Sequence, residues 1–383
     1  MKYEKVEEWE NLVNFMKGSN PEFLLKELEE ENVVGCFPLY PPLELFHSMG
    51  LTPVILWGLK DSVENFNISD RHLQGFSCSI ARELLQFTLT HKPDFECLFF
   101  YNACDTLRNL PDILQAGMRE RDMALPFIRM HLPMIPLERR GASAYLEKQI
   151  TTLITELEEF TGKIFDPEKF AESVDLYAQI RELSDRLEKM VASGKLSYAD
   201  FSACLQANYF RSPETQLAEL KNLEDNGFLK KPVNDDQVGV VISGIQPPPL
   251  PIIELIESAG LQIVGNDVAI QRRSYGYQPP NTKDPVYYFK QFYSNHFPCP
   301  TLLHTADKRP AHLLRFLEET GAKGVIFSAE KFCEYEYLEY PYLEKLFKEQ
   351  GINTLTLELT ASKTEDTGSY KTRIEAFAEL LKN

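Results

Sequence analysis

With 383 residues, 43% of them apolar and 25% charged, the chain has the composition of an ordinary globular protein and is too long for one typical core. Its formal net charge of −17 disfavours nucleic acid and anionic membrane surfaces as partners. No apolar stretch is long enough to span a bilayer, and the acidic N-terminus is unlike a secretion signal, so we expect a cytoplasmic protein.

The chain begins with a predicted helical segment, residues 1–30, in which apolar residues form a stripe among Glu and Lys. A first α/β domain is predicted over 31–142. Its expected strands are 33–37, 54–57, 97–101 and 125–129, and its expected helices are 43–49, 81–90 and 107–116. Alternating strands and helices are typical of a parallel sheet that binds ligands at the carboxyl ends of its strands.

Between 143 and 230 the apolar period becomes helical and no strand candidate interrupts it, which predicts a helical hairpin or small helical segment. A second α/β domain is predicted over 231–383. Its expected strands are 239–244, 262–264, 324–327 and 354–358, and its expected helices are 252–258, 311–319, 342–350 and 370–381. Each α/β domain has a proline-rich turn after its first strand, PLYPPLE and IQPPPLP, which is compatible with a duplicated unit.

The seven cysteines are scattered and include no CxxC pair, so in a reducing compartment they are free thiols or metal ligands. Free cysteine often only fills space in a core. Cys36 and Cys97 lie in predicted strands and Cys204 in a predicted helix, and all three are expected to pack there.

Three other cysteines have a different setting. Cys78 is flanked by serines at a helix start, where the helix dipole favours a thiolate, while Cys104 and Cys333 lie in polar loops that follow predicted strands. Thiols at strand ends converge on the ligand crevice of an open sheet, and three of them would suit an iron–sulfur cluster. Cys299, between two prolines, is a fourth candidate.

Other catalytic signatures are missing from the sequence. There is no Walker A motif, no GxGxxG after a strand, no GxSxG and no HExxH, so any ATP hydrolysis belongs to another protein. His47, His91 and His131 are expected to be packed or solvated. Glu44 follows a proline turn at a helix start, where it either caps the helix or faces the crevice as a catalytic carboxylate.

Several blocks together resemble the 2-hydroxyacyl-CoA dehydratase / benzoyl-CoA reductase family, and most closely the smaller, β-type subunit of the dehydratases. The resemblance runs from about Val33 to the C-terminus. The blocks are GCFPLYPPLELFHSMGLTPVILWG, FSCSIARELL, NACDTLRNL, GVIFSAEKFCEYEYLEYPYLEKLFKEQGINTLTLEL and KTRIEAFAEL. The resemblance implies two flavodoxin-like parallel-sheet domains, an additional helical segment and a 4Fe-4S cluster in the crevice between the domains.

By motif, the family's three cluster cysteines carry over to Cys78, Cys104 and Cys333, and Cys299 lies where the dehydratase β-type subunits have another cysteine. In this family a separate ATP-hydrolysing iron–sulfur activator delivers one electron to the catalytic subunits, which act on a CoA thioester. In the dehydratases a ketyl radical then expels the hydroxyl as water, whereas in the benzoyl-CoA reductases the electrons stay in the ring.

The resemblance therefore implies a lyase subunit that pairs with a larger homologous subunit or with itself and that relays electrons to an acyl-CoA substrate. Three alternatives stay open: a benzoyl-CoA reductase-type oxidoreductase subunit, a homodimeric cluster-dependent reductase, and a cluster-free α/β binding protein.

Overall fold

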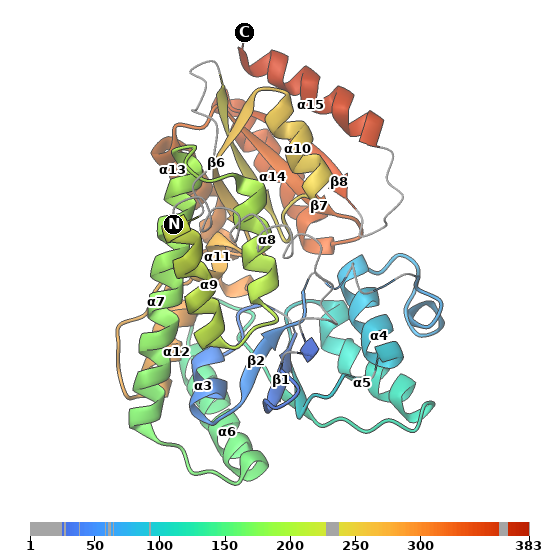
Figure 1. The fold of residues 1–383 in the computed structure, drawn as a ribbon, viewed down its shortest axis with the longest axis vertical. Helices are drawn as coiled ribbons and strands as arrows, with labels where there is room; N and C mark the ends of the chain where they lie inside the picture. Colours follow the sequence, from blue (N-terminus) through green and yellow to red (C-terminus); the bar gives the residue numbers. More distant parts are fainter. Residues whose placement is uncertain are drawn as a thin grey trace.

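The computed structural model describes residues 25–226, 237–359 and 367–382, apart from 27, 38, 58, 60–62, 64 and 92. The helix predicted for residues 1–30 lies almost entirely outside this part of the chain and stays a prediction. The described chain forms two sheets of parallel strands, one above the other in Figure 1, with long helices beside them.

The first sheet has four parallel strands in the order β2-β1-β3-β4. Its strands are β1 (Val33–Cys36), β2 (Thr52–Ile55), β3 (Cys97–Tyr101) and β4 (Phe127–Met130). Its helices are α3 (Leu43–Ser48), the short 3-10 helix η2 (Ser69–Arg71), α4 (Ser79–His91) and α5 (Asp105–Arg119). Residues 33–130 are called the first α/β unit below.

The second sheet has the strand order β6-β5-β7-β8, which is the same order as in the first. Its strands are β5 (Val238–Gly244), β6 (Leu261–Val268), β7 (Gly324–Glu330) and β8 (Asn353–Leu359). Its helices are α10 (Leu250–Ser258), α11 (Arg272–Tyr275), α12 (Pro285–Asn295), the 3-10 helix η3 (Leu303–Lys308), α13 (Arg309–Thr320), α14 (Glu334–Glu349) and α15 (Thr367–Lys382). Residues 238–382 are called the second α/β unit.

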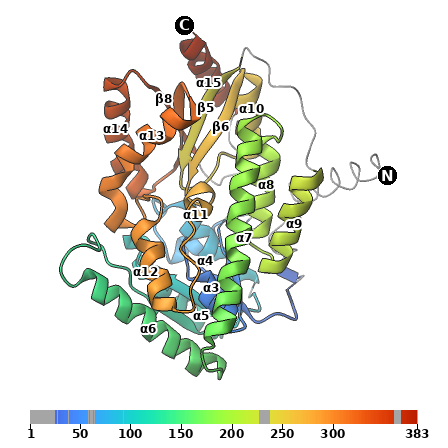
Figure 2. The same cartoon turned by 90° about the vertical axis from the view of Figure 1, so that its left-hand side faces the viewer.

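The helical part predicted between the sheets contains four helices, α6 (Ala142–Thr161), α7 (Pro167–Ala192), α8 (Tyr198–Asn208) and α9 (Pro213–Asn226). Helix α7 starts at the predicted Asp166-Pro167 junction, where the Asp166 carboxylate accepts from the Glu168 N–H at 2.9 Å. With 26 residues it is about 39 Å long. Figure 2 shows it running beside both sheets, and it packs on α3 of one unit and β6 of the other.

The expected α/β architecture with parallel sheets is confirmed, and the predicted bounds of β2, β4, β6 and β7 need correction. Strand β2 begins two residues before the predicted 54–57 because Pro53, which lacks an N–H for the ladder, is tolerated on the edge of the sheet. Strand β6 continues to Val268, well beyond the predicted 262–264. Its pairing with β5 shifts register between Val240 and Val241, and the strand continues past this irregularity.

Among the helices, α12 and α14 differ most from the prediction. Helix α14 begins at Glu334, eight residues earlier than predicted, and contains Pro341 in its interior. Helix α12 was not predicted, although Asp284 as N-cap and Pro285 in the first turn are a start signal for a helix.

One contiguous core runs through both units and the helices between them, from Val34 and Phe99 to Ile242 and Tyr288. A smaller core lies between the second sheet and helices α13 and α14. Because the larger core is shared, the two sheets are held in a fixed relation, and the carboxyl ends of their central strands contribute to one cavity.

Candidate functional site

A cavity of about 500 Å³ lies where the carboxyl ends of four central strands meet. Its wall includes Phe37 after β1, Cys104 after β3, Ile245 after β5 and Cys333 after β7. Strands β1 and β3 are neighbours in the first sheet, and β5 and β7 are neighbours in the second. In each sheet the connections that follow these two strands lead in opposite directions. Open α/β sheets bind their ligands at such a point. We call this space the cysteine cavity. Its volume is in the range of small-molecule and cofactor sites.

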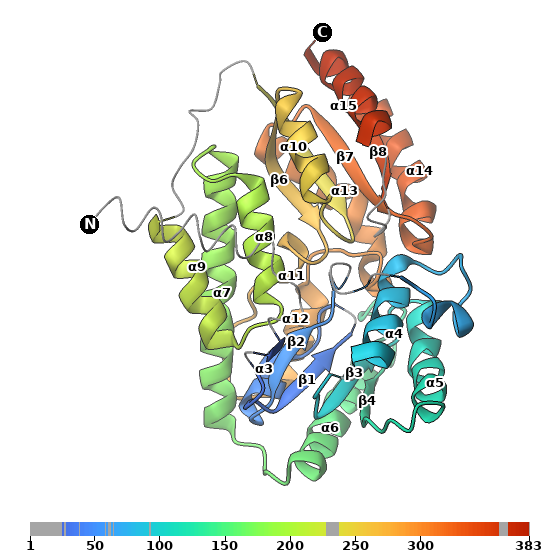
Figure 3. The same ribbon diagram turned by 45° about the vertical axis from the view of Figure 1, so that its right-hand side comes forward.

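Three thiols line the cysteine cavity, and each stands at the start of a helix. Cys78 directly precedes α4, Cys104 is the N-cap of α5, and Cys333 is the N-cap of α14. The Leu107 N–H donates to the Cys104 sulfur at 3.4 Å. Figure 3 shows α4, α5 and α14 on the same side of the molecule. A helix N-terminus carries partial positive charge and favours a thiolate or another anion.

Burial separates these three cysteines from the other four. Cys78, Cys104 and Cys333 are partly exposed, whereas Cys36, Cys97, Cys204 and Cys299 are fully buried and all seven are free thiols. The cysteines expected to pack are therefore buried in the core, and the three predicted ligands face the same cavity.

The pKa values of the three cavity thiols are raised, chiefly by burial. Each thiol also disfavours ionisation of another, because Cys104 raises the pKa of Cys78, and both raise the pKa of Cys333. Backbone N–H groups in the first turns of the helices act in the opposite direction. The three thiols are therefore protonated in the absence of a ligand, and holding them as thiolates would take a cationic centre that offsets desolvation and mutual repulsion.

Three cysteine thiols are the soft donors that this cavity offers to a metal centre. Within the ranges that the structure describes, no three His, Cys, Asp or Glu side chains form a site for one metal ion. In an iron–sulfur cubane each cysteine binds its own iron, so the thiolates stand farther apart than the ligands of one ion. The three thiols that line the cavity are of the soft kind that such clusters use as ligands.

The rest of the cavity wall is mainly apolar and aromatic, with Phe37, Trp57 and Ile80 among its residues. The Trp57 Nε1–H is buried and has no hydrogen-bond partner among the described residues. A ligand with acceptor atoms would satisfy this donor, whose burial is otherwise costly. Phe332, next to Cys333, also lines the cavity and has a φ of 65°, a strained conformation for a residue with a side chain.

The charged residues on the cavity wall are acidic. Asp105 and Glu334 line it, and its described lining includes no Lys or Arg. Phosphate groups are bound in proteins mostly by Arg, Lys and helix N-termini. The cavity is therefore suited to thiol-bound metal and poorly suited to a polyphosphate or nucleotide group.

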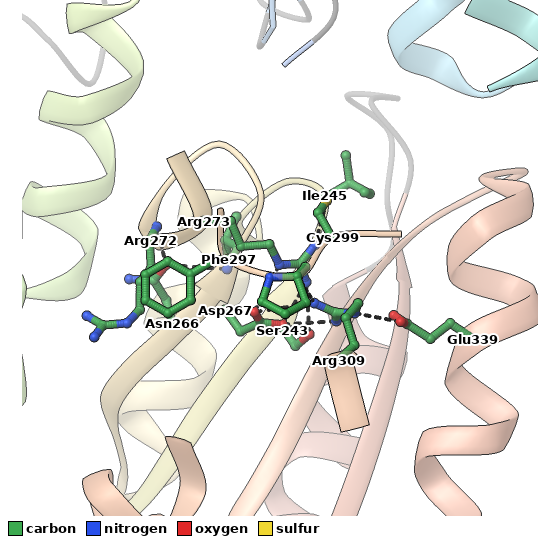
Figure 4. Close-up of polar contacts among 12 residues, drawn as sticks. Ser243, Ile245, Asn266, Asp267, Arg272, Arg273, Phe297, Cys299, Arg309 and Glu339 are labelled. Carbon is green, nitrogen blue, oxygen red and sulfur yellow. Dashed lines mark hydrogen bonds and ion pairs between the residues drawn. The ribbon is translucent and has the colours of Figure 1, made fainter. Parts of the chain in front are cut away.

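Cys299, the candidate fourth ligand, is not part of the cavity wall, although Thr301 is. Its sulfur accepts from Arg273 Nη1 at 3.4 Å and lies 3.1 Å from the Thr301 hydroxyl. Figure 4 shows Cys299 near a group of buried charged side chains, in which Arg273 and Arg309 both form ion pairs with Asp267. Burial alone would raise the pKa of Asp267, but the two guanidinium groups hold that pKa well below its usual range. The ligand role of Cys299 stays a prediction.

Glu44, the candidate catalytic carboxylate, lies away from the cavity wall in a buried ion pair. It is 1% exposed, accepts from Arg181 on α7 and receives the Tyr288 hydroxyl of α12 at 2.8 Å. These contacts join α3 to two helices distant in the sequence. The structure thus gives Glu44 a structural role, and its catalytic role stays a prediction.

Sequence reasoning missed Trp57 and Glu330. Glu330 ends β7 and is buried, and its carboxylate contacts the start of α4 in the other α/β unit. A charged residue at the end of an apolar parallel strand is a signal for this position, but the strand was predicted to end three residues earlier, at 327. Trp57 was assigned to a strand, whereas it follows β2.

Comparison with known proteins extends over nearly the whole chain. The family model described as 2-hydroxyglutaryl-CoA dehydratase, D-component, matches residues 38–381. The chain is 24% identical over 368 residues to the (R)-phenyllactyl-CoA dehydratase beta subunit of Clostridium sporogenes, which covers 94% of this chain and 96% of that one. No described helix is long and apolar enough to span a membrane.

Two other relatives match at similar identity. The beta subunit of (R)-2-hydroxyglutaryl-CoA dehydratase from Acidaminococcus fermentans is 24% identical over 379 residues, covering 95% of this chain and 96% of that one. A subunit of the benzoyl-CoA reductase of Thauera aromatica is 24% identical over 359 residues, covering 91% of each.

Proposed function

Because the chain belongs to the family of the 2-hydroxyglutaryl-CoA dehydratase D-component, we propose that it is the iron–sulfur subunit of a 2-hydroxyacyl-CoA dehydratase. Such an enzyme removes water from a hydroxyacyl-CoA thioester after one-electron transfer from a separate ATP-dependent activator. The observation that carries the proposal is the meeting of three partly exposed thiols, each at a helix start, around one cavity.

In this proposal Cys78, Cys104 and Cys333 hold a 4Fe-4S cluster, with Cys299 as the candidate fourth ligand. The cluster supplies one-electron chemistry, and the chain supplies the ligands and their surroundings. The helix N-termini at the three cysteines stabilise the negative charge of thiolates and sulfides. The aromatic wall keeps water away, which supports electron transfer at low potential.

The acidic lining supports a relay role for this chain. A CoA thioester carries phosphates that need cationic partners, and the described lining of the cysteine cavity offers none. We therefore propose that a larger homologous subunit binds most of the acyl-CoA, while this chain carries electrons and completes the site. The relatives are named as subunits, which supports a partner of this kind.

The surface around the cavity also supports a partner. Phe76, Phe332 and Tyr337 are 69%, 46% and 43% exposed, and all three line the cavity. Exposed apolar side chains gathered on one face are typical of an interface. The native mass of the chain, purified alone and with the larger subunit, distinguishes a homodimer from a heterodimer.

A reductase is the second candidate. The chain matches the benzoyl-CoA reductase relative over 91% of its length with the same identity as the phenyllactyl-CoA dehydratase relative. An assay of the assembled enzyme with a 2-hydroxyacyl-CoA and with an aromatic acyl-CoA separates the two. Water elimination without net electron consumption supports the dehydratase, and stoichiometric electron consumption supports the reductase.

The cofactor is tested on anaerobically purified protein by measuring iron and acid-labile sulfide and recording an EPR spectrum after reduction. We expect about four of each per chain and a reduced-cluster signal. Cys104→Ser should lose the iron, whereas Cys204→Ser should keep it because that thiol is buried in a helix away from the cavity. Equal iron content in the two variants contradicts the ligand assignment. A folded wild-type chain that cannot be loaded favours the cluster-free binding protein.

A further inference from the structure

The loop that carries Cys333 and the helix that carries Cys78 belong to different α/β units, and one side chain connects them. Glu330, the last residue of β7, accepts from the Ser79 backbone N–H at 3.0 Å and from the Ser79 hydroxyl at 2.5 Å. Ser79 is the first residue of α4, directly after Cys78. The carboxylate therefore caps α4 from the opposite unit, as a capping side chain normally does from within its own chain segment.

The same residue also holds the Cys333 loop through its backbone. The Cys333 N–H donates to the Glu330 carbonyl at 2.9 Å. Glu336 fixes the loop from the other side, because its carboxylate accepts from the Glu330 N–H and from the Ile245 N–H, both at 2.7 Å. Glu330 is thus attached to the Cys333 loop by its main chain and to the Cys78 helix by its side chain.

Burial makes this connection strong. Glu330 and Ser79 are 6% and 8% exposed, so water does not compete freely for their hydrogen bonds. A carboxylate at a helix N-terminus gains both from charge-assisted hydrogen bonds and from the helix dipole. The hydrogen bonds donated by the Glu330 N–H and the Cys333 N–H hold the Cys333 loop in place. As long as the Glu330 carboxylate also contacts Ser79, this loop has little freedom to move relative to α4.

We propose that Glu330 is a positioning residue that fixes the separation between Cys78 and Cys333 across the two α/β units. The role of this spacing in cluster binding rests on the proposed function, but the spacing itself does not. In a chain whose cavity thiols come from two units, a contact that sets the distance between units determines whether three thiolates can reach one centre.

Thiol crosslinking of the metal-free full-length protein measures the spacing without any cofactor. A short bis-maleimide is added to the folded protein, and crosslinked peptides are quantified by mass spectrometry. The three cavity thiols are the partly exposed ones, so the other four are protected by burial. The yield of the Cys78–Cys333 product is expressed relative to that of Cys78–Cys104, whose two residues lie within one unit.

We expect Glu330→Ala to lower this ratio, because the two units lose their connection next to Cys78 while the Cys78–Cys104 pair stays in place. Ser79→Ala, which keeps the backbone donor and removes only the hydroxyl, should lower the ratio less and keeps the test available if Glu330→Ala does not fold. Glu188→Ala is the matched control, because Glu188 is another buried carboxylate, bonded to Asn266 and Arg272, and none of these three residues lines the cavity. An unchanged ratio in Glu330→Ala, or an equal fall in the control, overturns the proposal.

Iron loading gives a second readout. At limiting iron, Glu330→Ala should bind iron about tenfold more weakly than wild type, as expected when a residue that orients a ligand is removed. If wild type takes up no iron, the proposed function fails while the crosslink ratio still tests the spacing. If wild type loads and Glu330→Ala loads equally well with an unchanged ratio, the positioning role fails while the proposed function stands.

Discussion

At the scale of single residues, burial distinguishes the cysteines that pack from those that face the cavity. Flanking residues predicted this division for six of the seven: apolar neighbours mark Cys36, Cys97 and Cys204, and polar neighbours at helix starts mark the three cavity thiols. Cys299 could not be assigned this way, because its surroundings depend on Arg273, which reaches it from a different part of the chain.

A variant of Glu44 distinguishes a structural role of its carboxylate from a catalytic one. Glu44→Gln leaves the Arg181 guanidinium buried without its charged partner, so we expect the free energy of unfolding to fall by roughly 3 kcal/mol. Urea denaturation of the two proteins measures this difference. Iron content per folded chain should not change, because Glu44 is not part of the cavity wall.

A matched control for Glu44 is Glu214→Gln. Glu214 also has a side-chain partner, because its Oε1 lies 3.1 Å from His47 Nε2. Its side chain is 64% exposed, so the variant should stay within about 0.5 kcal/mol of wild type. A Glu44→Gln protein with normal stability and lost activity would favour the catalytic role that the sequence suggested.

At the scale of elements, the sequence predicted strands well where they are buried and apolar and predicted less well where polar residues continue them. β3 (Cys97–Tyr101) was predicted with its observed bounds. Strand β7 was predicted to end at 327, yet it continues through the polar residues Ser328 and Glu330. Both are buried, and the Glu330 carboxylate accepts hydrogen bonds from Ser79, which only the folded protein brings near. Helix α14 was shortened in the prediction because Pro341 reads as a helix breaker.

The contact between β5 and β7 depends on Gly244. A Cβ at this position would lie 2.5 Å from the Ser328 carbonyl oxygen of the paired strand, and this backbone atom cannot rotate away. We expect Gly244→Ala to lower the free energy of unfolding by about 1–3 kcal/mol, because the two central strands must separate.

The comparison variant for Gly244 is Gly75→Ala. A Cβ at Gly75 would meet no heavy atom within 4 Å, so this variant should stay within about 0.5 kcal/mol of wild type in the same urea titration. Equal stability of Gly244→Ala and wild type would mean that the strands adjust at this position more easily than the structure indicates.

At the scale of the whole molecule, side chains of the helical and loop regions join the two sheets. Tyr293 on α12 donates to the Tyr40 carbonyl at 2.9 Å, and Tyr198 on α8 donates to Gln271 at 2.8 Å. Sequence periodicity predicts two sheets and a helical part but not these contacts, because each joins residues more than 70 positions apart. The resemblance implied a crevice between the domains, but the side chains that line the cysteine cavity had to come from the structure.

One histidine at the junction of the units should make the stability of the whole molecule depend on pH. His296 is 4% exposed and packs edge-on against Tyr40, with ring centroids 4.2 Å apart. Burial lowers the pKa of His296 to about 3, the hydrogen bond to the Phe297 carbonyl opposes this, and the charges of Arg181 and Arg273 add to it. The folded protein therefore holds the ring neutral.

The sign of the effect follows from proton binding. The unfolded chain, in which histidine has a pKa of about 6.5, binds a proton more readily than the folded chain, so stability from His296 is complete above pH 6.5 and is lost as the pH falls toward 3. Between pH 7 and pH 5 the loss should be roughly 2 kcal/mol. His296→Gln removes this titration, so its stability deficit relative to wild type, measured in urea at the two pH values, should shrink by the same amount. A constant deficit for His296→Gln would mean that the ring titrates alike in the folded and unfolded protein, which contradicts its burial as a neutral group.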